Sequence, residues 1–410
     1  MTHALSLQEI ARITSQAAPG DLARDEAFWA RFAALYDRDE SFVQLNYGFY
    51  HPALRPVLEA EQAMAREVNR RGSHFKWQES DALLEAARAE LAALAGADPE
   101  EIVITRNATE AMNIVIQGVA LARGDEVVCS DQDYPSMDQA WEQRAQAEGI
   151  VIRRARIPLD PADDEEVVRC FAAEITPRTR LLHVTHLIHL SGQVLPVARL
   201  CRLGRERGVP VLVDAAHAFA QLDFSVRALD CDYLATSLHK WLGAPLGTGM
   251  LYVRRDRISG VHPLFGDTRH AAGDIRRLEH FGNRPDALNA GLREAIRWHG
   301  ALGTPAKRAR LAYLQRQWAE PVRTWPRFRM LTPRAEARHG ALGLCVLDGV
   351  PAETLFRYLY REHGVFTVVQ KLPTIPGVRV TPGLPSSARD IARLLEGLRA
   401  AERHFPAAAG

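Results

Sequence analysis

The chain has 410 residues, of which 47% are hydrophobic and 25% are charged, and its 51 Lys and Arg residues nearly balance its 50 Asp and Glu residues. This composition is that of an ordinary globular protein and excludes a disordered, fibrous or membrane-embedded chain. A nucleic-acid-binding protein would normally carry a basic excess, so we expect no nucleic-acid partner. The sequence also shows no long uncharged apolar run and no secretory leader pattern. We therefore expect a cytoplasmic protein without a membrane partner.

Short apolar runs alternate with longer amphipathic stretches through the first three quarters of the chain. Strands are predicted over residues 101–105, 125–130, 150–157, 180–185, 209–214, 232–236 and 249–254. Helices are predicted over 108–120, 136–148, 165–174 and 196–207. Strands that alternate with helices of about a dozen residues indicate a parallel α/β sheet. The run at 209–214, which is apolar on both faces, is typical of a strand covered by helices on both sides.

After residue 285 the pattern changes to that of a smaller α+β unit. Helices are predicted over 286–302, 310–320, 352–362 and 387–403, and strands over 341–347, 365–369 and 378–381. The first fifty residues show no strand pattern, and we expect them to join the small unit. The predicted organisation is an N-terminal segment (1–50), a large α/β domain (51–300) and a small C-terminal α+β domain (301–410).

Neither the cysteines nor the histidines form a metal-binding pattern. The five cysteines are scattered and include no CxxC pair, so we expect neither a disulfide framework nor a zinc cluster. His183, His186 and His189 are three residues apart, which on a strand entering a loop places successive side chains on opposite faces. We predict no metal site.

The chemistry is concentrated between residues 214 and 249. An apolar strand ends at Asp214, which places a carboxylate at the edge of the sheet where α/β proteins bind ligands. Lys240 follows the next strand, after Ser237 and His239, and its apolar neighbours would lower the pKa of its amine and make it a nucleophile. Pyridoxal phosphate requires such a lysine for its Schiff base and an acid held against its pyridine nitrogen. We therefore predict a pyridoxal-phosphate enzyme with Lys240 and Asp214 as its catalytic residues.

The lysines leave few alternatives for this assignment. Only Lys76, Lys240, Lys307 and Lys371 occur, against 47 arginines. Three of the four lack the surroundings of Lys240, and we expect them on the surface.

Two segments carry a resemblance to a known family. SLHKWLGAPLGTGMLYVR (237–254) and VDAAHAFAQLDF (213–224) resemble pyridoxal-phosphate enzymes of fold type I in the aminotransferase class V superfamily. Within it they look most like the isopenicillin N epimerase-like branch, which is related to the cysteine desulfurases. The resemblance runs from residues 45–48 to 378–381. It implies an α/β fold with a mostly parallel seven-stranded sheet, a small-molecule amino-acid substrate, and a homodimer with shared active sites.

The resemblance assigns the phosphate contacts to two segments. Ala108 and Thr109 begin a predicted helix, whose free N–H groups and positive dipole end favour an anion. By resemblance, Ser237 and His239 supply further donors. Asn283 stands where related enzymes carry a Gly-Thr that reaches the phosphate of the neighbouring subunit.

The resemblance also places groups around the cofactor ring and the substrate. Tyr134 matches an aromatic residue that stacks on the ring, and His217 matches a residue that approaches the phenolic oxygen. His189 stands where relatives usually have an asparagine, and it adds a titratable group there.

Arg379 matches the arginine that binds the substrate carboxylate, a role that suits a bidentate guanidinium. Asn46 and Tyr47 lie in a segment that lines the substrate pocket in the family.

The reaction itself stays open at this stage. We expect an epimerase or aminotransferase, with a carbon–sulfur lyase or a non-catalytic binding protein as alternatives. Epimerisation needs proton donors on both faces of the α-carbon, and His189 or Tyr47 are candidates for the second donor. Cysteine desulfurases carry a reactive cysteine shortly before the substrate arginine, but residues 367–377 contain none, and Cys345 lies in an apolar strand pattern. We therefore do not expect desulfurase activity.

Overall fold

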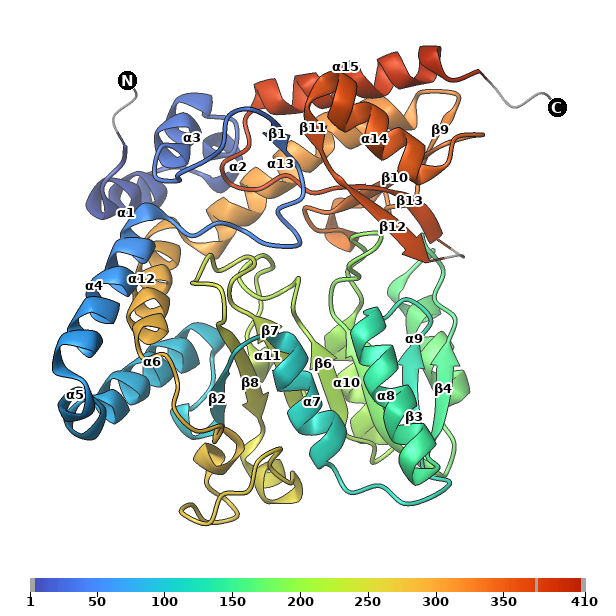
Figure 1. Ribbon diagram of the computed structural model, residues 1–410. Helices are drawn as coiled ribbons and strands as arrows, with labels where there is room; N and C mark the ends of the chain where they lie inside the picture. The colour runs from blue at the N-terminus through green and yellow to red at the C-terminus, as the bar shows by residue number, and fades with distance from the viewer. Residues whose placement is uncertain (1–3, 373–374, 407–410) are drawn as a thin grey trace.

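The computed structural model describes residues 4–372 and 375–406. Figure 1 shows a large sheet flanked by helices in the lower half of the view and a smaller sheet with α14 and α15 above it. The N-terminal helices lie beside the small unit, at the upper left of the view.

The large sheet contains the seven strands that the sequence predicts, each within two residues of its expected bounds. They are β2 (Ile102–Thr105), β3 (Glu126–Ser130), β4 (Val151–Ala155), β5 (Thr179–Thr185), β6 (Val211–Asp214), β7 (Tyr233–Ser237) and β8 (Gly249–Val253). Their order is β2-β8-β7-β6-β5-β3-β4. Only β8 is antiparallel to its neighbours, so the sheet is mostly parallel, as expected.

Helices cover both faces of this sheet. One face packs against α7 (Ala108–Gly118) and α8 (Pro135–Glu148), and the other against α9 (Asp164–Glu174) and α10 (Val197–Glu206). Successive residues of one strand enter different cores: Val127 packs with α7 and α8, and Val128 with α9 and α10. This alternation accounts for strands that are apolar on both faces.

Further helices surround the sheet and connect it to the small unit. They are α1 (Leu7–Gln16), α2 (Pro19–Leu22), α3 (Glu26–Ala33), α4 (Arg55–Arg71), α5 (Ser73–Gln78), α6 (Ser80–Ala95), α11 (Val226–Leu229), α12 (Ala287–Leu302), α13 (Thr304–Arg323) and the 3₁₀ turns η1 (Pro99–Glu101), η2 (Arg255–Gly260), η3 (Ile275–Leu278) and η4 (Glu336–Arg338). Within the described ranges, no helix is long and apolar enough to cross a membrane.

The small unit is a four-stranded antiparallel sheet covered by helices. Its strands, in the order β12-β13-β10-β9, are β12 (Val368–Leu372), β13 (Ile375–Val380), β10 (Gly343–Leu347) and β9 (Phe328–Met330). Its helices α14 (Ala352–His363) and α15 (Ala388–His404) pack on each other, and α15 also packs on α13. The sequence did not predict β9, whose three residues are too few for a recognisable alternation.

Two sequence expectations are corrected here. The strand predicted over residues 365–369 is divided between two strands, because β11 (Val365–Phe366) leaves the small sheet and pairs with β1 (Val43–Gln44). The first fifty residues therefore do contain a strand, although it is too short to show a pattern. This pairing lies beside the small unit, and α12 ends at Leu302. We propose domain limits near residues 50 and 300 on that basis.

Candidate active site

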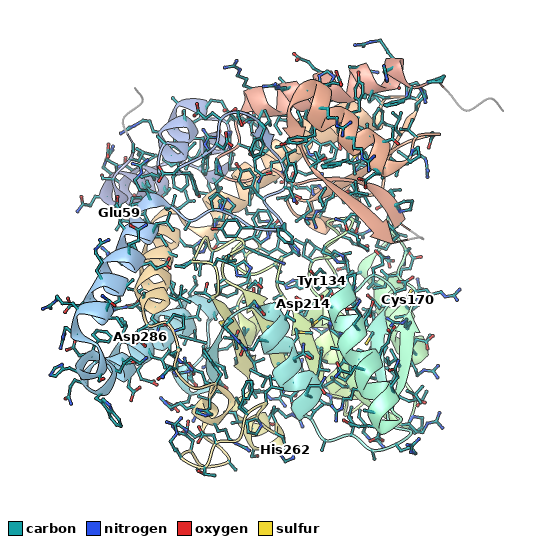
Figure 2. All side chains as sticks on the ribbon, viewed as in Figure 1. Glu59, Tyr134, Cys170, Asp214, His262 and Asp286 are labelled. Atoms are coloured by element: carbon teal, nitrogen blue, oxygen red, sulfur yellow. The ribbon has the colours of Figure 1, made fainter. Side chains whose placement is uncertain are left out.

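A cavity of about 290 Å³ lies at the carboxyl ends of the parallel strands. The predicted residues that line it are Ala108, Thr109, Tyr134, His189, Asp214, His217, Ser237, His239, Lys240 and Arg379. Figure 2 shows Tyr134 and Asp214 near one another at this edge of the sheet, below the small unit. The structure thus brings most of the predicted site together.

Lys240 follows β7 and is enclosed by the cavity wall. Its Nζ lies 3.3 Å from Nε2 of His217. Burial lowers the pKa of Lys240 to about 8, the nearby carboxylate of Asp214 opposes this shift, and the positive charge of Arg379 adds to it. The amine is therefore a better nucleophile near neutral pH than an exposed lysine.

Asp214 ends β6 in the middle of the sheet. It is paired with Thr185 on one side and Ala235 on the other, and its Oδ1 accepts a hydrogen bond from the Ala216 amide at 2.9 Å. Burial raises the pKa of Asp214, although the Ala216 amide and the positive charge of Lys240 act in the opposite direction. A buried carboxylate of this kind is stabilised by a cationic partner, which a protonated pyridine nitrogen would supply.

The end of the cavity where we propose that the phosphate binds is built where α7 meets β7 and β8. The Ala108 amide donates to Oγ of Ser237 at 2.9 Å, so the helix start and the strand end are in contact. Gly249 makes this approach possible, because a Cβ there would lie 2.6 Å from Cα of Asn107. The result is a helix N-terminus flanked by hydroxyl groups, which suits a phosphate.

Two neutral histidines face the middle of the cavity. Burial lowers the pKa of His189 to about 3, with smaller contributions from the positive charges of Arg379 and Lys240. Burial and the same two cations hold the pKa of His217 well below its usual value. In both rings Nδ1 is buried without a hydrogen-bond partner, and Tyr134 packs edge-on against His189 at 5.1 Å between ring centroids. Both rings thus line the cavity in the neutral form, and each carries one buried nitrogen that no described group pairs with.

Arg379 is buried without a carboxylate partner among the described residues. Its Nη1 donates to the carbonyl of His189 at 2.8 Å, its Nη2 donates to Oδ1 of Asn46 at 3.0 Å, and its Nε has no partner. Burial lowers the pKa of Arg379 to about 10. The carboxylate of an amino acid would supply the missing charge and the missing acceptor.

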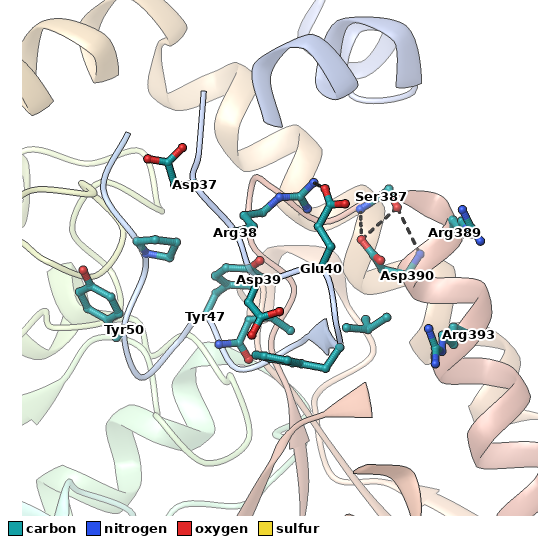
Figure 3. A pocket seen from close by; sticks show the side chains of 14 residues that line it. Asp37, Arg38, Asp39, Glu40, Tyr47, Tyr50, Ser387, Arg389, Asp390 and Arg393 are labelled. Carbon is teal, nitrogen blue, oxygen red and sulfur yellow. Dashed lines mark hydrogen bonds and ion pairs between the residues drawn. The ribbon is translucent and has the colours of Figure 1, made fainter. Parts of the chain in front are cut away.

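Three predicted residues do not line this cavity. Asn46 adjoins it through Arg379, whose Nη2 donates to its Oδ1, and the other two lie further away. Tyr47 lines a neighbouring cavity of about 460 Å³ together with Tyr50, which also lines the Lys240 cavity. Figure 3 shows this second cavity, where side chains of both charge signs surround Tyr47. Asn283 is exposed and lines a separate hollow with Lys76 and Trp77. The expectation for Asn283 concerns the site of a second chain, so one chain does not test it.

Sequence reasoning missed the remaining lining residues. They are Gly48, Phe49, Tyr50, Asn107, Met137, Thr185, Leu187, Ala216 and Leu246. Thr185 ends β5 beside Asp214 and donates to Oδ1 of Asp133 at 2.6 Å, so its strand-end position was a usable signal. Phe49 and Leu246 are 70% and 64% exposed, and nothing in the sequence marks them.

The expectation that Lys307 is a surface residue is wrong. Lys307 is 3% exposed, and its Nζ donates to the carbonyl of Trp241 and lies 3.2 Å from Nδ1 of His299. The predicted helix began at residue 310, but α13 begins at Thr304 and places Lys307 on the same buried stripe as Leu311 and Leu314.

The two remaining lysines outside the cavity are Lys76 and Lys371. Lys76 is partly exposed and pairs with Asp286 at 2.7 Å. The side chain of Lys371 lies outside the described residues.

One cluster of three potential metal ligands occurs within the described part of the chain, formed by Cys129, Asp133 and His183. Nδ1 of His183 accepts a hydrogen bond from the Trp141 indole at 3.3 Å. Asp133 accepts from the hydroxyl of Thr185 and from the backbone amide of Ser130. Protein donors thus already engage Nδ1 of His183 and both carboxylate oxygens of Asp133, and we assign no ion to the cluster.

Comparison with known proteins gives a consistent relationship. The family model described as Aminotransferase class-V matches residues 52–368. The chain is 33% identical to an isopenicillin N epimerase of Amycolatopsis lactamdurans over 90% of this chain and 98% of the relative, and 31% identical to one of Streptomyces clavuligerus over 88% and 95%. A probable cysteine desulfurase of Vibrio cholerae is 27% identical over 81% of this chain and 85% of the relative.

Solved structures share the fold. A cysteine desulfurase of Escherichia coli superposes with a TM-score of 0.81 at 23% identity, covering 92% of this chain and 99% of that chain. A cystine C–S lyase in complex with cysteine persulfide gives a TM-score of 0.79 at 25% identity, covering 88% and 97%. With the amine, carboxylate and helix N-terminus that pyridoxal phosphate requires gathered in one cavity, the chain belongs to the aminotransferase class-V family of pyridoxal-phosphate-dependent enzymes.

Proposed function

We propose that this protein acts at the α-carbon of an amino acid or an amino-acid-like metabolite, as an epimerase or an aminotransferase. The observation that carries the proposal is the convergence of Lys240, Asp214 and Arg379 on one cavity. The similarity to two isopenicillin N epimerases over most of the chain supports an epimerase.

The residues of the cavity would hold the cofactor in one orientation. Asp214 would face the pyridine nitrogen, and His217 the phenolic oxygen beside the Lys240 amine. Tyr134 would cover the ring, with His189 next to it. The phosphate would lie against residues 108–109, Ser237 and His239, and Asn283 of a second chain would reach it.

Pyridoxal phosphate, when bound, supplies an aldehyde that condenses with amines and a ring that accepts the electrons left at the α-carbon. Lys240 would remove the α-proton as a base and return it as an acid, for which a pKa near 8 is well suited. Arg379 would hold the substrate carboxylate and fix which α-carbon bond faces Lys240.

An epimerase also needs a proton donor on the opposite face of the α-carbon. Of the two candidates that the sequence suggested, His189 lines the Lys240 cavity, whereas Tyr47 lies in the neighbouring one. We therefore favour His189, because it lines the same cavity as Lys240.

A carbon–sulfur lyase is the second candidate function. The structural similarity to a cystine C–S lyase favours it. A desulfurase reaction through a protein persulfide has less support, because residues 367–377 contain no cysteine. Cys345 is buried in β10, and burial raises the pKa of its thiol to about 12. A non-catalytic role would not explain an amine, a buried carboxylate and a buried guanidinium in one cavity.

We further propose a cytoplasmic homodimer that binds no nucleic acid. The exposed Trp77, 85% accessible and beside Asn283, supports a second copy covering this hollow. The five unpaired cysteines are consistent with the cytoplasm.

Incubation of the holoenzyme with single amino acids in deuterated water tests the reaction type. Deuterium at the α-carbon with loss of chirality would identify an epimerase, and a keto acid would identify an aminotransferase. Pyruvate with a released thiol would identify a lyase. The absence of α-deuterium exchange with every amino acid and peptide tested would contradict the proposal.

A further inference from the structure

The backbone around Lys240 is fixed by a donor at each of four successive carbonyls. Three accept backbone amides: Leu238 from Ala244 at 3.1 Å, His239 from His51 at 3.3 Å and Lys240 from Gly243 at 3.1 Å. The fourth, the carbonyl of Trp241, accepts instead from the Lys307 side chain of α13. An amine from a helix 66 residues further along the chain thus completes the turn that carries the cofactor lysine.

The surroundings of Lys307 do not favour a charged group. The ionisable side chains that line the space around it are Tyr36, His51 and His299, and none of them is a carboxylate. Lys307 also lies in the first turn of α13, where the helix dipole disfavours a cation. Burial lowers the pKa of Lys307 to about 7. An apolar side chain of similar length would fill this space without the desolvation of an amine, so packing alone does not explain the lysine.

We propose that Lys307 is a positioning residue for the cofactor site, fixing the Trp241 carbonyl and through it the Lys240–Gly243 turn. His299 orients the amine, because its Nδ1 lies 3.2 Å from Nζ and its Nε2 lies 3.1 Å from Oγ1 of Thr304. The inference rests on the proposed role of Lys240. Without the amine, the Trp241 carbonyl is buried without this donor, and the turn is free to reorient its peptide.

Lys307→Met tests this role, because it keeps an unbranched side chain of nearly the same length and removes the donors. We expect the affinity of the apoprotein for pyridoxal phosphate to fall about tenfold or more. We also expect the midpoint of the pH-dependent change in the visible absorbance of the holoenzyme to move. A purely structural residue would lower the unfolding temperature without moving that midpoint.

Arg310→Met is the matched control. Arg310 is a buried cation on the same helix that donates to the carbonyls of Ala23 at 2.9 Å and Ser386 at 3.1 Å, away from the Lys240 turn. It should lower the unfolding temperature and leave the cofactor affinity and the absorbance midpoint unchanged. The double variant Lys307→Met/His299→Leu removes both the amine and the histidine that contacts it. It replaces Lys307→Met in the comparison if that single variant does not fold.

Cofactor affinity and an absorbance midpoint equal to those of the unchanged protein, in whichever Lys307 variant folds, would overturn the inference. Failure of both variants to fold would also overturn it, since a purely structural role would then suffice. Labelling of the unchanged protein separates failure of this inference from failure of the proposed function. If borohydride reduction with pyridoxal phosphate labels Lys240 in the unchanged protein, but Lys307→Met binds the cofactor with normal affinity, only the positioning role is wrong.

Discussion

Arg379 is the residue whose role is most open to a direct kinetic test. Its guanidinium is buried without a carboxylate, and two of its nitrogens are already positioned by the His189 carbonyl and Asn46. Arg379→Gln removes the charge that would bind the substrate carboxylate, so KM should rise by roughly 10- to 100-fold. Steady-state kinetics on the amino acid that exchanges its α-proton measures this effect.

Arg389→Gln is the control for that experiment. Arg389 is exposed and lines the neighbouring cavity of Figure 3, so its variant should leave KM unchanged. A KM for Arg379→Gln within twofold of the unchanged enzyme would show that the substrate carboxylate binds elsewhere.

Lys307 also gives a prediction about stability. Its pKa is lowered from 10.5 in the unfolded chain to about 7 in the folded one, so between these values the unfolded chain binds more protons. The free energy of unfolding therefore gains a contribution from Lys307 that rises with pH through this window, by at most about 1.4 kcal/mol per pH unit. Below pH 7 the lysine is charged in both states and its contribution no longer changes.

Urea unfolding of the apoprotein at pH 7, 8 and 9 measures this contribution. Relative to Lys307→Met, the unchanged protein should gain stability as the pH rises. A difference between the two proteins that stays constant across this range would mean that Lys307 keeps an ordinary pKa in the fold.

The contact between β8 and the start of α7, where we propose that the phosphate binds, depends on one glycine. A Cβ at Gly249 would meet the backbone of Asn107 at 2.6 Å, so Gly249→Ala should push β8 away from the start of α7. We expect a loss of about 1–3 kcal/mol in the free energy of unfolding. The affinity for pyridoxal phosphate should fall as well, because the Ala108 amide moves away from Ser237.

Gly260→Ala is the matched control, since a Cβ there would meet no atom within 4 Å. Urea unfolding and cofactor titration of both variants complete the test. Normal cofactor affinity in Gly249→Ala would show that the contact between α7 and β8 does not shape the phosphate site.

Helices and strands with a strong apolar pattern could be predicted from the sequence. Very short strands, and strands that form only by pairing with a distant segment, could not. The seven strands of the large sheet are apolar enough to be recognised and are found where expected. By contrast, β1 and β11 exist only because they pair with each other across more than 300 residues. The start of α13 was also missed, and with it the burial of Lys307, since neither propensity nor charge marks a lysine as buried.

The residues of the candidate active site differ in the same way in how far the sequence could predict them. Motif residues at strand ends, such as Asp214 and Ser237, could be placed because parallel strands share one carboxyl edge. Phe49 and Leu246 could not, because they enter the cavity from irregular segments. Tyr47 and Asn46 are neighbours in sequence, but Tyr47 lines the second cavity and Asn46 accepts a hydrogen bond from Arg379.

At the scale of the whole molecule, the proposed dimer predicts complementation between two defective chains. Lys240→Ala lacks the amine in its own site, and Asn283→Ala would lack the phosphate contact in its partner's site. When the two are unfolded and refolded together, random pairing should restore about a quarter of the sites, because half of the dimers are mixed and each has one intact site. This fraction is measured as cofactor binding at a pyridoxal phosphate concentration too low to fill the variant sites.

Refolding each variant alone is the control for complementation. No gain on mixing would mean that Asn283 acts within its own chain or not at all. Mass photometry of the unchanged protein should show a dimer.

The most direct test of the whole account is the identity of the lysine that carries the cofactor. The protein is incubated with pyridoxal phosphate, reduced with borohydride, digested and mapped by mass spectrometry. We predict a pyridoxyl group on Lys240 and its loss in Lys240→Ala, although Lys307 is also a buried amine with a lowered pKa. An adduct on Lys76, Lys307 or Lys371, or none at all, would contradict the assignment of the active site.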